Sequence, residues 1–168
     1  MRISKLAEQK IYTHDALLKK VAQVKFLGKS IAFTNGCFDI LHRGHIFSLS
    51  QSATEADFFI VGLNSDASTK RLKGKNRPIN DEQSRALLLA SLFIVDAVII
   101  FDEDTPFELI KALKPDVLIK GGDYTTEQIA GSSEVIANGG RVVINPIVSG
   151  FSTTDLINRI RNAECEIK

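Results

Sequence analysis

Two histidines, His42 and His45, stand three residues apart where a short apolar strand is expected to turn into a helix. Residues at this spacing share one face of a helix, so both imidazoles would lie on its first turn. Unpaired backbone N–H groups and the positive end of the helix dipole favour an anion there. The chain has only three histidines, and two of them fall in this four-residue window. That clustering favours a functional pair over two surface or capping histidines.

The chemistry open to this pair is phosphate chemistry. Imidazole N–H groups can donate hydrogen bonds to the oxygens of a phosphate under attack. Gly44 places no side chain between the two rings, which lets a nucleotide approach the backbone closely. Two donors on an α-phosphate would stabilise the charge that develops during in-line displacement. No nucleophile with an adjacent base stands nearby, so direct transfer is favoured over a covalent intermediate.

The elements that must hold this pair alternate along the chain. Apolar, β-branched runs predict strands at residues 30–34, 58–63, 97–101, 117–120 and 141–145. Helical spacing predicts helices at 13–27, 43–56, 81–93, 106–113 and 152–162, and one at 125–138 that Gly131 should break. Near-continuous apolar strands separated by helices imply a doubly wound, Rossmann-like α/β fold with a five-stranded parallel sheet and helices on both faces. Ligands would then bind outside the carboxyl ends of the strands.

Length and composition set limits on the kind of protein. A chain of 168 residues suits one domain, and we expect residues 1–29 to form an accessory helix on a main domain of residues 30–168. The net charge of +1 argues against a nucleic-acid partner. No apolar run is long enough to span a membrane, and no signal peptide is evident. The two cysteines lack the spacing of a disulfide framework or a zinc site. We therefore expect a cytoplasmic protein without a membrane partner.

A second candidate anion site lies in Gly150-Phe-Ser-Thr-Thr-Asp155. Ser152 or Thr153 can cap the last helix and direct N–H groups and hydroxyls toward an anion. An ordinary helix cap is the alternative for this segment alone. Together with the histidine pair, a second phosphate site is favoured.

Residues 70–77 form a basic segment with five positive charges and no acid. Gly74, Asn76 and Pro78 predict a loop, which could close over phosphates. A solvated basic loop is the usual alternative, and RNA binding is weakened by the lack of interleaved aromatic residues.

The segment Thr34–His45, TNGCFDILHRGH, resembles the His-x-Gly-His signature of the nucleotidyltransferase superfamily, which includes cytidylyltransferases and phosphopantetheine adenylyltransferase. Further segments resemble, in the same order, the adenylyltransferases that make ADP-heptose; they are 62–68, 71–78, 101–106, 120–124 and 150–154. The similarity extends from about residue 28 to residue 161. Arg43 fills a position that is often small, apolar or aromatic in relatives, and we assign it no role.

The resemblance implies an activity and its partners. AMP would pass from ATP to a sugar 1-phosphate, D-glycero-β-D-manno-heptose 1-phosphate, with release of pyrophosphate for lipopolysaccharide or surface-glycan synthesis. Mg²⁺ would be bound mainly through the ATP phosphates, since the sequence has no dedicated carboxylate cluster. Relatives are commonly dimers, so a homodimer is expected.

The resemblance also assigns residues to roles. The catalytic residues would be His42, His45 and Lys73. The nucleotide would be bound by Thr34, Asn35, Gly36, Cys37, Phe38, Asp39, Gly44, Lys120, Gly121, Gly122, Asp123, Ser152, Thr153 and Thr154. The acceptor would be bound by Asn64, Asp66, Arg77 and Arg85. Alternative roles stay open for four of these residues: Asp39 as a turn residue, Asp123 as a turn or N-cap residue, and Asn64 with Asp66 at the cap of a following helix.

Two other functions remain possible on the sequence alone. A related enzyme would transfer CMP from CTP to glycerol 3-phosphate. A non-catalytic nucleotide- or RNA-binding module would use the same residues for binding without turnover.

Overall fold

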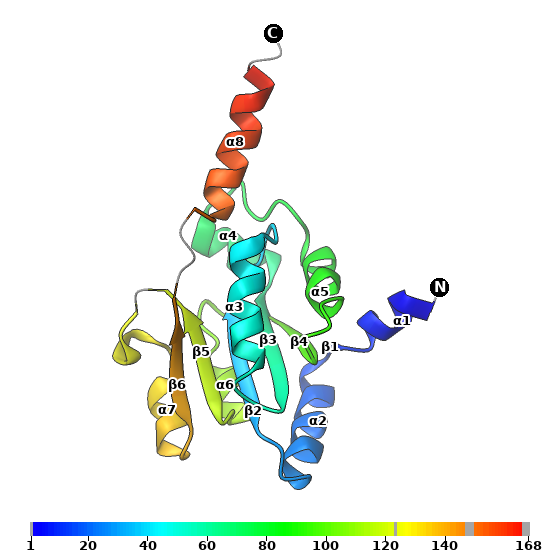
Figure 1. Cartoon of the computed structure of the whole chain (residues 1–168), viewed down its shortest axis with the longest axis vertical. Coiled ribbons are helices and arrows are strands. Elements are labelled where there is room, and N and C mark those ends of the chain that lie inside the picture. The colour runs from blue at the N-terminus through cyan, green and yellow to red at the C-terminus, as the bar shows by residue number, and fades with distance from the viewer. Residues whose placement is uncertain (1, 123, 147–149, 166–168) are drawn as a thin grey trace.

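The computed structural model describes residues 2–122, 124–146 and 150–165 and shows a parallel sheet covered by helices on both faces (Figure 1). The sheet has six strands in the order β1-β4-β3-β2-β5-β6. The strands are β1 (Ile11–Tyr12), β2 (Ile31–Gly36), β3 (Phe58–Asn64), β4 (Ala97–Phe101), β5 (Val117–Gly121) and β6 (Arg141–Asn145). The doubly wound α/β fold predicted from the sequence is confirmed.

The predicted number of five strands is wrong, because β1 adds a sixth at one edge. This strand has two residues, and Ile11 and Tyr12 pair with Val98 and Ile99 of β4. Two residues are too few to show the alternation from which a strand is predicted. The segment expected to form an accessory helix therefore contains helix α1 (Arg2–Glu8), strand β1 and helix α2 (His14–Phe26).

Two hydrophobic cores lie on opposite faces of the sheet, because alternate strand residues point to opposite sides. Phe33 and Ile60 pack on one face against α2, α6 (Phe107–Leu113) and α7 (Ser132–Ala137). Ala32 and Phe59 pack on the other face against α3 (Arg43–Ala53) and α5 (Glu82–Ala90). The buried residues of the amphipathic helices thus fix the helices on the sheet, and the strand ends are left to carry the site.

Strand order reverses between β2 and β5, so their carboxyl ends form the switch point where α/β proteins bind ligands. Thr34 of β2 pairs with Ile119 of β5, and the Thr34 hydroxyl donates to the Ile119 carbonyl at 3.0 Å. Helix α8 (Thr153–Cys165) rises from this edge of the sheet and points away from the layers (Figure 1).

One predicted loop is partly helical. Helix α4 (Asp66–Lys73) takes up the first half of the basic segment 70–77, and Gly74 ends it at a φ of 97°. The small polar residues Ser68 and Thr69 form its buried side, so it lacks the apolar periodicity that predicts a helix. The 125–138 region is divided as predicted: Gly131, at a φ of 84°, separates the 3₁₀ turn η1 (Thr126–Gln128) from α7.

In the part of the chain that the structure describes, none of the helices combines the length and apolar character needed to cross a membrane.

Candidate active site

The two histidines stack on each other at the start of α3. Their ring centroids lie 3.8 Å apart, and the ring planes differ by 15°. His42 is the N-cap, and its Nδ1 accepts a hydrogen bond from the backbone N–H of His45 at 3.3 Å. Because Nδ1 is an acceptor here, the proton of the neutral His42 ring lies on Nε2. The cap thereby leaves His42 Nε2–H as a donor for a ligand.

Partial burial favours the neutral form of both rings. It lowers the pKa of His45 to about 4, with His42 adding to the effect and the Ile40 backbone opposing it. Burial also lowers the pKa of His42. His45 Nδ1 is buried and has no hydrogen-bond partner among the described residues. Since buried polar atoms are rarely left unpaired, this pair suits a site that is completed by a ligand.

Acidification should destabilise the fold through His45. The unfolded chain binds this proton near the ordinary pKa of 6.5, whereas the folded protein binds it only near a pKa of about 4. Between these values the unfolded state holds more protons, so the free energy of unfolding falls as the pH falls. Thermal unfolding across this range should therefore show a weaker pH dependence for His45→Gln than for wild type. His14→Gln, at an exposed histidine, is the control, and an unchanged pH profile for His45→Gln would contradict the assignment.

A strained turn lies in loop 35–39, the segment made of the last two residues of β2 and the three residues that follow it. Phe38 has a φ of 43°, a left-handed conformation that costs a side-chain-bearing residue about 1–2 kcal/mol. Its ring meets His45 edge-to-face at a centroid distance of 5.3 Å. A Cβ on Gly36 would lie 3.0 Å from the same ring, so a larger residue there would force the ring to shift. The turn thus brings an aromatic ring against the second histidine.

Asp39 is turned into the protein. Its side chain accepts hydrogen bonds from the backbone N–H groups of Ile79 at 2.7 Å and Asn80 at 3.0 Å, and from Arg77 Nε. With 1% of the residue exposed, the carboxylate is fully occupied by residues 77–80. The structure therefore places Asp39 as the residue that fastens this segment to loop 35–39.

Phe151 joins the two candidate phosphate motifs. A Cβ on Gly44 would lie 3.0 Å from Phe151 Cβ, and the Phe151 ring stacks over His42 at a centroid distance of 6.5 Å. Arg43 also contacts this ring, with its Cζ 5.7 Å from the Phe151 ring centre. The sequence analysis gave neither Arg43 nor Phe151 a role, since an aromatic residue beside a serine-threonine run carries no signal of its own.

The residues after Phe151 begin α8 as predicted. Ser152 Oγ accepts from the backbone N–H of Asp155 at 3.4 Å, so Ser152 caps the helix. Thr153 and Thr154 form its first turn. Because Phe151 contacts Gly44, this helix start is attached directly beside the histidine pair.

Two lysines, Lys120 at the end of β5 and Lys73 at the end of α4, bring positive charge to the site. Lys120 Nζ donates to Asn35 Oδ1 at 3.1 Å and lies 5.9 Å from the centre of the Tyr124 ring. Burial lowers the pKa of Lys120, Cys37 acts against this, and the nearby charge of Lys73 lowers it further. Lys73, at the exposed end of α4, therefore lies close enough to Lys120 for its charge to lower the pKa of Lys120. Two such cations favour an anion between them.

Two glycines, Gly121 and Gly122, follow Lys120 at the end of β5. Gly122 has a φ of 132°, and a Cβ there would lie 2.9 Å from the Tyr124 ring. Gly121 ends β5 and would place its Cβ 3.4 Å from Ser48 Oγ. Asp123 lies outside the described residues.

The predicted acceptor residues are mostly engaged within the protein. Asn64 Nδ2 donates to Ser68 Oγ at 3.0 Å, and Arg77 pairs with Asp39. Arg85 is 0% exposed and pairs with Asp66 at 2.8 Å. Asp66 alone keeps a third of its side chain exposed. These residues are brought together, but chiefly by contacts with one another.

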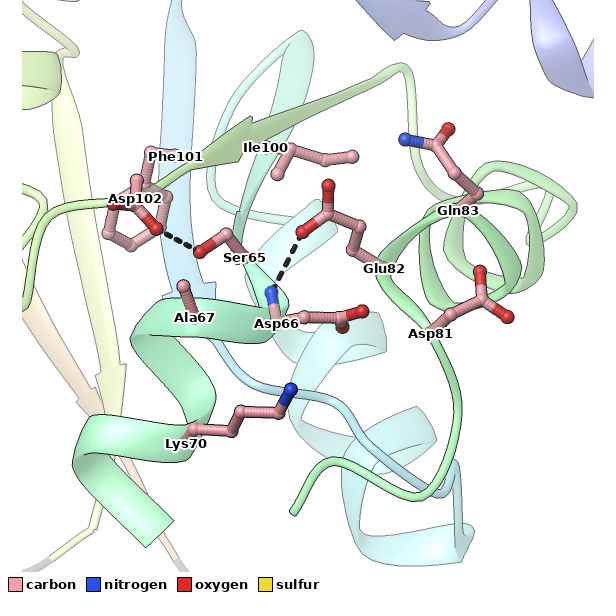
Figure 2. Close-up of a pocket in the computed structure, with 10 residues that line it drawn as sticks. All are labelled: Ser65, Asp66, Ala67, Lys70, Asp81, Glu82, Gln83, Ile100, Phe101 and Asp102. Atoms are coloured by element: carbon pink, nitrogen blue, oxygen red, sulfur yellow. Dashed lines mark hydrogen bonds between the residues drawn. The ribbon is translucent and has the colours of Figure 1, made fainter. Parts of the chain in front are cut away.

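A cavity of about 700 Å³ opens beside them, at the carboxyl ends of β3 and β4 (Figure 2). Asp66, Lys70 and Glu82 are among the residues that line it. Glu82 accepts from the backbone N–H of Asp66 at 2.8 Å, and Ser65 donates to Asp102 across the cavity floor. The histidines do not line this cavity, so it adjoins the switch point from the side of α4 and α5.

Within residues 2–122, 124–146 and 150–165, no group of three or more His, Cys, Asp or Glu side chains is arranged to hold a metal ion.

Comparison with known proteins places the same residues in a family. The cytidylyltransferase-like family model matches residues 33–159. The bifunctional protein HldE of Hyphomonas neptunium is 57% identical over 145 residues, which are 86% of this chain and 30% of that protein. HldE of Rhodopseudomonas palustris is 52% identical over 94% of this chain and 32% of that protein. The chain thus spans about a third of the length of these relatives.

Solved structures agree with this placement. The lipopolysaccharide core biosynthesis protein from Thermoplasma volcanium is 33% identical, with a TM-score of 0.59 over 72% of this chain and 98% of that one. Pantoate-β-alanine ligase from Francisella tularensis is 16% identical, with a TM-score of 0.50 over 83% of this chain and 73% of that one, and shares the fold alone.

Proposed function

This chain belongs to the cytidylyltransferase-like family, and on that premise we propose that it transfers AMP from ATP to D-glycero-β-D-manno-heptose 1-phosphate. The products are ADP-heptose, for lipopolysaccharide or another surface glycan, and pyrophosphate. One observation carries the proposal: the stacked histidine pair is joined through Gly44 and Phe151 to the start of α8. Donors for the reacting phosphate and a receptor for the leaving pyrophosphate thus lie side by side.

The proposed reaction is a direct in-line displacement. An oxygen of the acceptor's phosphate forms a bond to the α-phosphorus, and the bond to the bridging oxygen breaks with its electron pair leaving on pyrophosphate. His42 donates Nε2–H to a non-bridging oxygen of the α-phosphate, and His45 assists from the stacked ring. As neutral donors these rings need not lose a proton in the step.

The two lysines and the start of α8 stabilise the negative charge of the other phosphates. Lys73 and Lys120 face the phosphates, while the N–H groups and hydroxyls of Ser152–Thr154 receive the pyrophosphate. The ATP phosphates would hold Mg²⁺, which would neutralise part of their charge. Asp39 is not counted as its ligand, because the carboxylate already accepts three hydrogen bonds within the chain.

The choice of acceptor is supported by the relatives. The Thermoplasma protein is titled a lipopolysaccharide core biosynthesis protein, and the curated relatives are named HldE. We assign the acceptor's sugar to the cavity of Figure 2, where Asp66 and Lys70 can meet its hydroxyls and phosphate. We also propose that the protein works in the cytoplasm without a nucleic-acid or membrane partner. We also propose a homodimer, for which the exposed side chain of Phe93 offers an apolar contact.

A matrix of two nucleotides and two acceptors tests the function. ATP or CTP is combined with heptose 1-phosphate or glycerol 3-phosphate, and pyrophosphate release and product mass are measured. We expect turnover only with ATP and heptose 1-phosphate. Turnover with CTP and glycerol 3-phosphate would instead establish a cytidylyltransferase. Nucleotide binding without pyrophosphate from any pair would indicate a non-catalytic module.

A further inference from the structure

Arg85 is a buried arginine whose donors are nearly all in use. Nε donates to the Asn80 carbonyl at 3.0 Å. Nη1 donates to the carbonyls of Cys37 at 2.6 Å and Asn64 at 2.9 Å, and Nη2 donates to Asp66 Oδ1 at 2.8 Å. A guanidinium has five N–H groups, so one remains. With 0% of the residue exposed, Arg85 offers no free face to an acceptor phosphate.

The contact with Cys37 fixes one peptide of loop 35–39. In a trans peptide the C=O and the following N–H point in opposite directions. Because the Cys37 carbonyl points at buried Arg85, the N–H of Phe38 must point away from Arg85. Phe38 also holds the left-handed conformation and touches His45 with its ring. The orientation of this peptide thus affects both a backbone donor and a histidine neighbour.

The other contacts of Arg85 tie this peptide to the opposite side of the site. Asn64 ends β3, Asp66 begins α4, and Asn80 belongs to the segment that Asp39 holds. One planar guanidinium therefore sets the spacing between loop 35–39 and the elements around the cavity of Figure 2. Lysine cannot reproduce this, because its single ammonium lacks the rigid fork that reaches several acceptors in one plane.

We propose that Arg85 is a positioning residue for the nucleotide side of the site: it holds the Cys37–Phe38 peptide so that the Phe38 N–H faces the nucleotide phosphates. The inference rests on the proposed nucleotide transfer but not on the identity of the acceptor. It replaces the expectation, from family resemblance, that Arg85 contacts the acceptor's phosphate.

The variant Arg85→Lys separates the two roles. Binding of Mg²⁺·α,β-methylene-ATP should weaken about tenfold, the loss expected for one misplaced hydrogen bond. We expect kcat to fall by about 10- to 100-fold, since small displacements of reacting groups are costly. We expect a smaller rise in the acceptor KM, because Asp66 of the acceptor cavity loses part of its contact with residue 85. A raised acceptor KM with unchanged nucleotide binding would overturn the proposal. Arg141→Lys, at an exposed arginine paired with Glu55, is the matched control and should bind the analogue as wild type does.

A second variant covers the case in which Arg85→Lys fails to fold. Asp66→Asn combined with Arg85→Met leaves no buried charge without a partner, so it avoids the largest cost of replacing Arg85. The double variant should bind the analogue about tenfold more weakly than Asp66→Asn alone, and equal binding would overturn the proposal. Circular dichroism verifies folding of each variant.

The wild-type protein gives an independent measurement. On addition of Mg²⁺·α,β-methylene-ATP, the backbone amide proton of Phe38 should shift in the NMR spectrum, and an unshifted amide would overturn the proposal. Since none of the binding experiments needs an acceptor, they remain decisive even if heptose 1-phosphate proves not to be the substrate.

Discussion

Replacing His45 with alanine should lower kcat for AMP transfer by about 10²-fold or more, the cost of losing a donor to the charge of the transition state. His45 stacks on His42 and follows Gly44, which contacts Phe151 at the start of α8, so its ring lies where we place the reacting phosphate. Substrate binding depends on many other groups, so the KM for ATP should change much less than kcat. Pyrophosphate release at saturating ATP measures the effect.

Two further variants show whether the loss of rate comes from the missing donor. His45→Gln keeps an N–H donor near the ring position and should recover part of the lost rate. His14→Ala, at an exposed histidine on α2, should leave the rate unchanged. Equal turnover by wild type and folded His45→Ala would exclude the catalytic role and favour a binding module.

Much of the fold could be predicted because its signals are local. Strands 97–101 and 141–145 match β4 and β6, since both are continuous β-branched runs. The β1 strand depends on pairing with a distant β4, and two residues carry no periodicity. Helix α4 could not be predicted from apolar periodicity either, because its buried face consists of the polar residues Ser68 and Thr69 and the rest of it is strongly basic.

The part of the site formed by residues close together in the sequence could be predicted. His42 and His45 need only one helical turn to meet, and the structure stacks them. The contact between Phe151 and Gly44 spans more than a hundred residues, so no local pattern reveals it.

Arg85 shows a signal that could have been used. It lies four residues before Leu89 and next to Ala86, and all three are fully buried on one face of α5. Helical phase therefore predicts burial for Arg85, although its charge suggests a ligand contact. For a buried arginine the acceptors must come from the protein itself, because an unpaired charge inside is too costly.

The pairing of Asp39 with Arg77 should have a large effect on stability. Asp39→Asn leaves Arg77, whose side chain is 15% exposed, without its counter-charge. It also replaces one carboxylate oxygen by an NH₂ group, which cannot accept from the N–H groups of Ile79 and Asn80. Loss of one partner of a buried pair costs about 3–5 kcal/mol. For a chain of this size we therefore expect the melting temperature to fall by roughly 6–20 °C.

A double-mutant cycle attributes this loss to the pair itself. Once Asp39→Asn has removed the charge, Arg77→Gln should cost far less than it does in wild type, with a coupling of about 1–3 kcal/mol. The exposed pair of Arg141 and Glu55 is the matched control, and its cycle should show about 0–1 kcal/mol. Unfolding by urea gives the four free energies for each cycle. If the two cycles show the same small coupling, Asp39 does not fasten residues 77–80 to loop 35–39 through Arg77, and the loop must be held by the backbone N–H groups of Ile79 and Asn80 alone.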